Sequence, residues 1–278
     1  MTVVRRDRVN PKKAESFRIS KIIGRHEGED FFVVGSGSSL IGFKYGLVRG
    51  LNTIALNDAI KAKNFIPRYH LFSDAHLYNG FLKKGSKSGG TNPSGGYRDW
   101  PYHPEIEILC QKRERVSFNK DRGPNWNPVW EFDSSGSALT VKRHDDGLFI
   151  NRTVATAAIM FAWKMGAKRI FLLGIDGYKL RIGSTDIYYF DGSDKPPEKR
   201  QIKAQEYIAP GQVKIIQDRH DFWKKQMQEL KRFFVSMGNP YPGNFPGPGV
   251  YNLNEHSTID AWPKVSPVLA ISTVRAGV

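Results

Sequence analysis

The residues best suited to chemistry are small or polar, and they directly follow short apolar segments. The run Phe31–Val34 leads into Gly35-Ser36-Gly37-Ser38-Ser39, and an apolar stretch that begins at Leu40 is expected to form a helix to about Val48. A turn of small residues between a strand and a helix lets backbone N–H groups approach an anion, which the helix dipole also favours. The third glycine of a G-x-G-x-x-G dinucleotide fingerprint is absent, because position 40 is leucine. The turn predicts a phosphate or nucleotide site, with a plain tight turn as the alternative.

Two further apolar segments also end in polar residues. Residues 52–56 lead into Asn57-Asp58, and residues 69–72 lead into Ser73-Asp74-Ala75-His76. In open α/β sheets, ligands bind beyond the carboxyl ends of the strands. We therefore expect Ser36, Asn57 and Asp74 to meet at one sheet edge. Asp74 and His76 would suit a divalent ion held with phosphates, and a strand-end cap is the alternative.

A helix–glycine–strand unit is expected from residue 153 to residue 174. Asn151 or Thr153 suits the N-cap of the helix, and Gly166 ends it before a buried strand. Asp176 and Tyr178 then leave the carboxyl end of that strand, at the same edge as before. Tyr178 and Tyr188 are phenols that would donate to a departing phosphate, or they are ordinary loop aromatics.

A long amphipathic helix is expected over residues 221–235, and His220 stands just before it. A histidine at a helix edge can act as a general base near neutral pH. No nucleophile elbow, zinc-protease helix, Gly-Lys-Ser/Thr phosphate loop or kinase motif set is present, and no histidines are paired at metal-ligand spacing. The sequence thus predicts no metal-binding residue set.

The alternation of strands and helices predicts an α/β fold, a Rossmann-like, mostly parallel sheet with helices on both faces. We expect a single domain over residues 1–278 with a basic N-terminal extension, 1–30, and a last strand at 250–253. Residues 83–147 begin with a run rich in glycine and lysine and lack a clear βαβ rhythm. They are expected to be an insertion or lid.

The amino-acid composition limits the kinds of partner and the location that can be expected for this chain. The chain of 278 residues has 42 Lys and Arg against 27 Asp and Glu, a formal net charge of +15. Such a charge favours a polyanionic partner, with general solubility as the alternative. The single cysteine, Cys110, suits a cytoplasmic protein, and neither a secretory signal nor a run of 18 apolar residues is found. Oligomeric state is not predicted.

The ordered motifs resemble those of the bacterial sialyltransferases of glycosyltransferase family 42 and of a broader group related to hydroxymethylpterin pyrophosphokinase, domain of unknown function 115. They are Gly35-Ser-Gly-Ser-Ser-Leu40, then Leu56-Asn57-Asp58, then Phe171-Leu-Leu-Gly-Ile-Asp176-x-Tyr178. The tail Tyr251-Asn-Leu-Asn-Glu-His-Ser257 is similar to that group's closing strand and serine turn. The resemblance covers about residues 31–80 and 148–262, and residues 83–147 have no counterpart.

The resemblance implies a nucleotide-sugar donor, CMP-linked in the family, and transfer with inversion by direct displacement. It implies that the glycine turn lines the nucleotide phosphates and that Tyr178 and Tyr188 stabilise the leaving phosphate. It makes His220 the general base for the acceptor hydroxyl. The implied nucleotide contacts are Gly35, Ser36, Gly37, Ser38, Asn57, Asp74, Thr153 and Asp176. Ser36 stands where the family has asparagine, and Val154-Ala155 replaces Ser-Gly, so another nucleotide sugar is an alternative donor.

Three functions follow as hypotheses. The first is a nucleotide-sugar-dependent glycosyltransferase in which a divalent cation is possible but not required. Its acceptor is expected to be nucleic acid, for example a hydroxymethylated base of viral DNA that is flipped into the site, ahead of a glycan. The second is a pyrophosphokinase of the pterin type, with Asp58, Asp74 and Asp176 gathering Mg²⁺ around ATP. The third is a non-catalytic nucleic-acid-binding protein.

Overall fold

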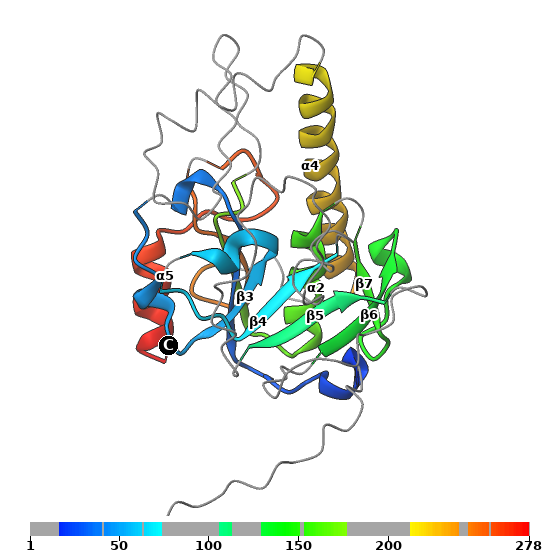
Figure 1. Ribbon diagram of the computed structural model, residues 1–278, viewed down its shortest axis with the longest axis horizontal. Helices are drawn as coiled ribbons and strands as arrows, with labels where there is room; N and C mark the ends of the chain where they lie inside the picture. Colours follow the sequence, from blue (N-terminus) through cyan, green and yellow to red (C-terminus); the bar gives the residue numbers. More distant parts are fainter. Residues whose placement is uncertain are drawn as a thin grey trace, which may run out of the picture.

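A computed structural model describes nine stretches of the chain around one parallel sheet (Figure 1). These stretches are residues 17–40, 42–62, 64–73, 106–112, 129–150, 153–176, 212–238, 244–255 and 257–277. The strands are β1 (Phe17–Arg18), β2 (Asp30–Val34), β3 (Asn52–Leu56), β4 (Tyr69–Phe72), β5 (Glu107–Gln111), β6 (Val129–Ser135), β7 (Gly147–Phe149), β8 (Arg169–Leu173) and β9 (Gly249–Asn252). Every pairing among them is parallel.

The strand order reverses once in the middle of the sheet. The sheet reads β1-β6-β5-β4-β3-β2-β8-β9, with β7 paired to β6. The chain therefore moves outward from β2 as far as β6, then crosses back to place β8 on the other side of β2. Val34 lies opposite Leu173 where these two central strands end. The fold is Rossmann-like α/β, as predicted, and the boundary between β2 and β8 is its topological switch point.

Alternate side chains of the central strands enter two separate cores. Phe31 and Val33 of β2 face one core, whereas Phe32 and Val34 face the other, and all four are fully buried. A strand that is buried on both faces needs apolar residues at every position, which explains why residues 31–34 are all apolar. The first core also takes the inner faces of helices α2 (Val154–Lys164) and α4 (Gln212–Ser236). The second takes helix α5 (Pro267–Arg275).

The helices match the predicted positions in part. Thr153 is the N-cap of α2, where its hydroxyl accepts a hydrogen bond from Ala155 N at 3.2 Å. Helix α4 begins at Gln212, so His220 lies inside it and not before it. Helix α5 was not predicted; Pro267 at its first position and Ala270 and Ile271 on its buried side are the signals that mark it.

The segment after the glycine turn was expected to be a helix to about residue 48. The structure has two short 3₁₀ helices there, η2 (Ser38–Leu40) and η3 (Tyr45–Val48), separated by Gly42 in the left-handed region. A left-handed residue interrupts helical hydrogen bonding, so the chain cannot continue as one α-helix. Within residues 83–147, which were expected to be an insertion or lid, β5 and β6 continue the central sheet after β4.

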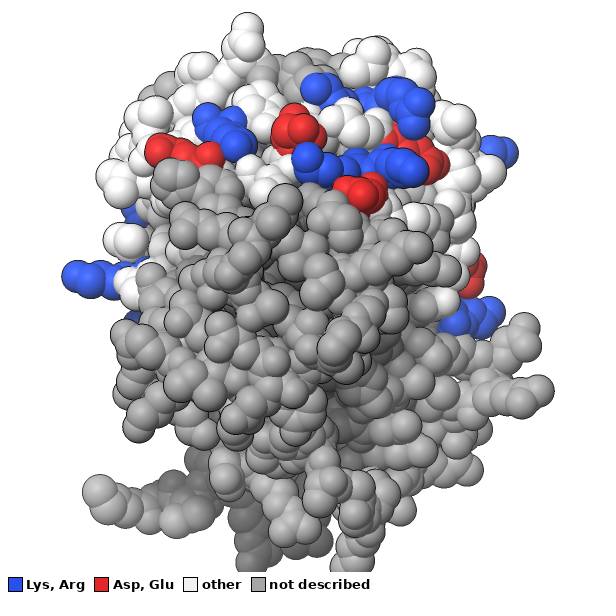
Figure 2. All heavy atoms as spheres, turned by 90° about the horizontal axis from the view of Figure 1, so that it is seen from above, with Lys and Arg blue, Asp and Glu red and all other residues white. Residues whose placement is uncertain are grey.

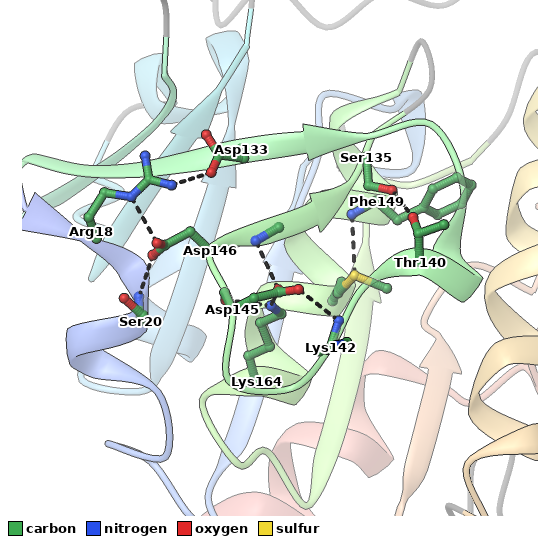
Figure 3. A network of polar contacts seen from close by, with 12 residues as sticks. Arg18, Ser20, Asp133, Ser135, Thr140, Lys142, Asp145, Asp146, Phe149 and Lys164 are labelled. Carbon is green, nitrogen blue, oxygen red and sulfur yellow. Dashed lines mark hydrogen bonds and ion pairs between the residues drawn. The ribbon is translucent and has the colours of Figure 1, made fainter.

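Charged residues fasten the edge of the sheet to helix α2 (Figure 3). Lys164 is fully buried, and its ammonium donates to Asp145 Oδ1 at 2.5 Å and to the carbonyl of Asp145 at 2.7 Å. Arg18 of β1 bonds Asp146 at 2.9 Å and also pairs with Asp133 of β6. Asp145-Asp146-Gly147 is therefore a structural turn in this fold. Among the helices that the structure describes, none is long and apolar enough to cross a membrane.

Candidate functional site

The glycine turn and Asp176 lie on the two sides of the switch point. The turn leaves β2 at Gly35, and Asp176 leaves β8 two residues after Gly174. The amide of Gly35 donates to Leu173 O at 2.8 Å, and the amide of Gly37 donates to Gly174 O at 2.9 Å. The β2–β8 pairing is thereby extended beyond the strands. The first predicted site element and Asp176 are brought together as expected.

Asp176 clamps the turn through its carboxylate. Its Oδ2 accepts from Ser39 N at 2.8 Å, and its Oδ1 accepts from Ser39 Oγ at 2.6 Å and from Asn254 Nδ2 at 2.7 Å. The side chain is buried. Hydrogen bonds to a carboxylate are stronger than those between neutral groups, so they hold the turn in one shape. Asp176 is a positioning residue in this structure.

The two glycines of the turn are required by close packing within the protein. A Cβ on Gly35 would lie 2.5 Å from the carbonyl oxygen of Gly174, and one on Gly37 would collide with the Asp176 carboxylate. The amides of Gly35 and Gly37 are already used in the β8 contacts, and Ser39 and Leu40 also donate within the protein. Among the turn residues whose contacts the structure describes, Ser36 is the one whose amide has no protein partner. This N–H group is the candidate for an anion.

Asn57 adds a polar atom at the end of the neighbouring strand β3. It adopts φ +47°, a left-handed conformation that asparagine tolerates better than most residues, at the start of 3₁₀ helix η4 (Asn57–Lys61). Its carbonyl accepts from His70 Nε2 at 2.9 Å, which fixes the backbone. Its Oδ1 is buried without a hydrogen-bond partner among the described residues. A buried acceptor left unpaired costs about 1–3 kcal/mol, so a ligand donor would recover that free energy.

The other predicted residues divide into two groups. Thr153 is buried, and both its hydroxyl and its carbonyl serve helix α2, the latter by accepting from Thr156 Oγ1 at 3.1 Å. His220 lies in the described backbone of α4, but its side chain is outside the described residues, as is that of Ser38. Asp74, Tyr178 and Tyr188 also lie outside the described residues.

From the sequence, the tail after residue 250 is expected to be a closing strand and serine turn, but the residues of this tail are given no role in the site. Asn254 and Ser257 follow β9, and Ser257 Oγ donates to the carbonyl of Asp176 at 2.9 Å. The amide of Thr258 donates to the same carbonyl at 3.0 Å. Asn and Ser just after a strand are a signal for side chains that bond nearby backbone, which would have marked this turn. The sequence carries no signal that Asp176, which lies 78 positions before Asn254, is the partner of this asparagine.

Asp176 is poorly suited to hold a metal ion. Both carboxylate oxygens already accept hydrogen bonds from protein donors, and a cation would have to compete with these donors. No group of three His, Cys, Asp or Glu side chains with metal-binding geometry occurs within the described ranges. In this part of the chain the donor set fits an anion better than a cation.

Comparison with known proteins gives a weak structural similarity and no match to a family. No protein-family model matches it, and no curated protein is similar to it. Among solved structures, it is similar to the MAf glycosyltransferase from Magnetospirillum magneticum AMB-1, with a TM-score of 0.49 and 12% sequence identity. The similarity covers 95% of this chain and 38% of that one, so this chain spans less than half of the larger protein. A TM-score below 0.5 assigns neither family nor activity.

Proposed function

We propose that the chain is a glycosyltransferase that uses a nucleotide sugar, with the nucleotide held at the β2–β8 switch point. The observation that carries the proposal is the turn of residues 35–39, fixed by Asp176 at the place where open α/β sheets bind ligands. In this proposal the amide of Ser36 faces the phosphates, and Asn57 Oδ1 accepts from a hydroxyl or amino group of the nucleotide. A preorganised site binds with less loss of conformational entropy.

The chemical step follows from the residue roles that the family resemblance implies. His220 removes the proton of the acceptor hydroxyl, whose oxygen attacks the anomeric carbon of the donor sugar. The bond to the nucleotide phosphate breaks on the opposite face, and configuration is inverted. Tyr178 and Tyr188 donate hydrogen bonds to the departing phosphate, which lowers the barrier as charge accumulates there. The acceptor is a polyanion, and the net charge of +15 favours nucleic acid over a glycan.

A pyrophosphokinase would need a cluster of carboxylates around Mg²⁺. The hydrogen bonds that both oxygens of Asp176 accept argue against that use, since removing these partners would also release the turn. The transferase therefore has the better structural support. Asp58 and Asp74 do not decide between the two, because neither side chain is described.

The test is a thermal-shift panel of CMP-, UDP-, GDP- and dTDP-sugars, followed by assay of nucleotide release with DNA or glycan acceptors. A specific donor at 100 times its Kd stabilises the fold by about 2.7 kcal/mol. We expect one nucleotide class to stabilise the chain without metal, and release to fall about 100-fold or more in His220→Ala. Stabilisation by ATP only with Mg²⁺, together with AMP release, would establish the kinase instead.

A further inference from the structure

The face of the molecule in Figure 2 does not show one continuous basic surface among the described residues. In the view of Figure 2, the Lys and Arg side chains of described residues stand beside Asp and Glu side chains. Net charge alone therefore does not locate a binding surface, and a local excess of cations must be sought.

Helix α4 carries such an excess along one face. We define the α4 basic face as Lys224, Lys225, Gln228, Lys231 and Arg232. Residues at spacings i, i+1, i+4, i+7 and i+8 share one side of a helix, and at 1.5 Å per residue they extend over about 12 Å. The cationic side chains thus form a short row along the helix axis.

A groove runs beside this row. Its walls are four residues of the α4 basic face, all but Lys231, and Asp260 of the segment that follows β9; it encloses about 460 Å³. Asp260 accepts from Gln228 at 3.5 Å and lies 3.6 Å from the Lys224 ammonium. Within the described part of the chain, Lys225, Lys231 and Arg232 have no carboxylate within ion-pair distance. Within the groove, one carboxylate faces three cations, so the groove is positively charged.

The opposite face of α4 decides which partner fits. Met227, Leu230, Phe233 and Phe234 are buried in the core, with Trp163 of α2 packed on the two phenylalanines. A basic amphipathic helix binds a membrane by burying its apolar face in lipid, which is impossible for a face already in the core. The basic face is left to act by charge alone. A row of cations beside a groove matches a row of phosphates, and arginine binds phosphate in a bidentate fashion.

We propose that the α4 basic face binds the phosphate backbone of a nucleic-acid strand. The inference rests on the acceptor class of the proposed function, but not on glycosyl transfer. His220 precedes Lys224 by four residues, one helical turn, so a strand on this face runs toward the proposed base. The surface lies outside the nucleotide site at the switch point.

The test measures affinity of the whole chain for a fluorescent single-stranded 30-mer DNA over a KCl series. Lys225→Glu/Arg232→Glu is compared with Lys21→Glu/Lys112→Glu, which changes net charge equally at exposed sites away from α4. We expect the α4 variant to lose at least tenfold in affinity and the control much less. The slope of log K against log salt should flatten by about 1.4, which is two phosphate contacts.

Two outcomes would overturn the proposal. Equal losses in both variants would show that only overall charge matters. Unchanged DNA binding, with loss of binding to a sulfated polysaccharide in the α4 variant, would assign the face to an acidic glycan. Both variants change exposed side chains, and far-UV circular dichroism confirms folding before each titration. Because no donor sugar is present, failure here leaves the transferase proposal standing.

Discussion

Ser39 and Asp176, separated by 137 positions in the chain, are joined by two hydrogen bonds, one from the serine amide at 2.8 Å and one from its hydroxyl at 2.6 Å. This pair links the turn after β2 to the end of β8. Asn254, in the segment after β9, donates to the same carboxylate. Three segments of the chain therefore meet at Asp176, and their contacts fix the geometry of the candidate site.

The clamp predicts that Asp176→Asn destabilises the fold. Three donors face the carboxylate, and the amide nitrogen of asparagine cannot accept from any of them. Leaving a buried donor unpaired costs about 1–3 kcal/mol, which urea unfolding would measure. Asp260→Asn is the matched control, because Asp260 is exposed and its pairing contributes about 0–1 kcal/mol. Equal effects of the two substitutions would contradict the clamp.

Gly37→Ala is expected to disrupt the same turn by steric contact. Its Cβ would collide with the Asp176 carboxylate, which three hydrogen bonds hold in place. Overpacking of this kind costs about 1–3 kcal/mol. Gly46→Ala is the control, since its Cβ would enter open space. Differential scanning calorimetry should show a lower unfolding temperature for Gly37→Ala and an unchanged one for Gly46→Ala. Equal unfolding temperatures would mean that the turn can shift to accept the added methyl group without cost.

Acid is expected to destabilise the fold through His26. The imidazole is buried between Glu29 Oε2 at 2.8 Å and the Tyr69 hydroxyl at 2.9 Å. Burial lowers its pKa below the usual value, although the bond to Glu29 acts in the opposite direction. The unfolded chain therefore takes up the proton first, and the free energy of unfolding falls as pH drops through about 6.5.

Urea unfolding between pH 8 and pH 5.5 checks this dependence. In His26→Gln the decline over that range should be smaller, because the titrating group is gone. A variant with the same pH profile as the native chain would assign the dependence to other groups.

The buried pair of Lys164 and Asp145 predicts an asymmetry between its two members. Asp145→Ala leaves a fully buried ammonium without its carboxylate, at a cost of about 3 kcal/mol. Lys164→Met removes the charge and keeps the apolar stem, so its cost should be smaller. Hydrogen bonds from Lys164 and from the Lys142 amide outweigh burial and hold the pKa of Asp145 below its usual range. Urea unfolding of both variants measures the loss in the free energy of unfolding. Equal losses in Asp145→Ala and Lys164→Met would contradict a buried charge at Lys164.

The sequence predicts the central strands well because apolar runs such as 31–34 can be buried only inside a parallel sheet. It predicts the glycine turn and Asp176 as neighbours because both follow strand ends. It does not predict that β5 and β6 extend the sheet, since their few apolar residues are separated by long polar stretches. Nor does it predict that Asp176 is engaged by Ser39 and Asn254, because such pairings depend on three-dimensional proximity between distant segments.

The start of helix α4, and with it the position of His220, was also not predicted correctly from the sequence. A helix boundary at residue 221 rests on where the strong apolar pattern begins, whereas α4 starts at Gln212. In the first turns of the helix the apolar residues are Val213, Ile215 and Ile216, and the next one is Phe222. The apolar pattern is interrupted there, so periodicity places the boundary too late.

The most direct test of the account is nucleotide affinity in Asn57→Gly. Glycine keeps the left-handed backbone at φ +47° and removes the unpaired Oδ1, so the variant should fold as well as the native chain. Titration calorimetry with the nucleotide found in the donor panel should show affinity at least about tenfold weaker, the loss of about one hydrogen bond. An affinity equal to that of the native chain, in a folded variant, would contradict a nucleotide site at the β2–β8 switch point.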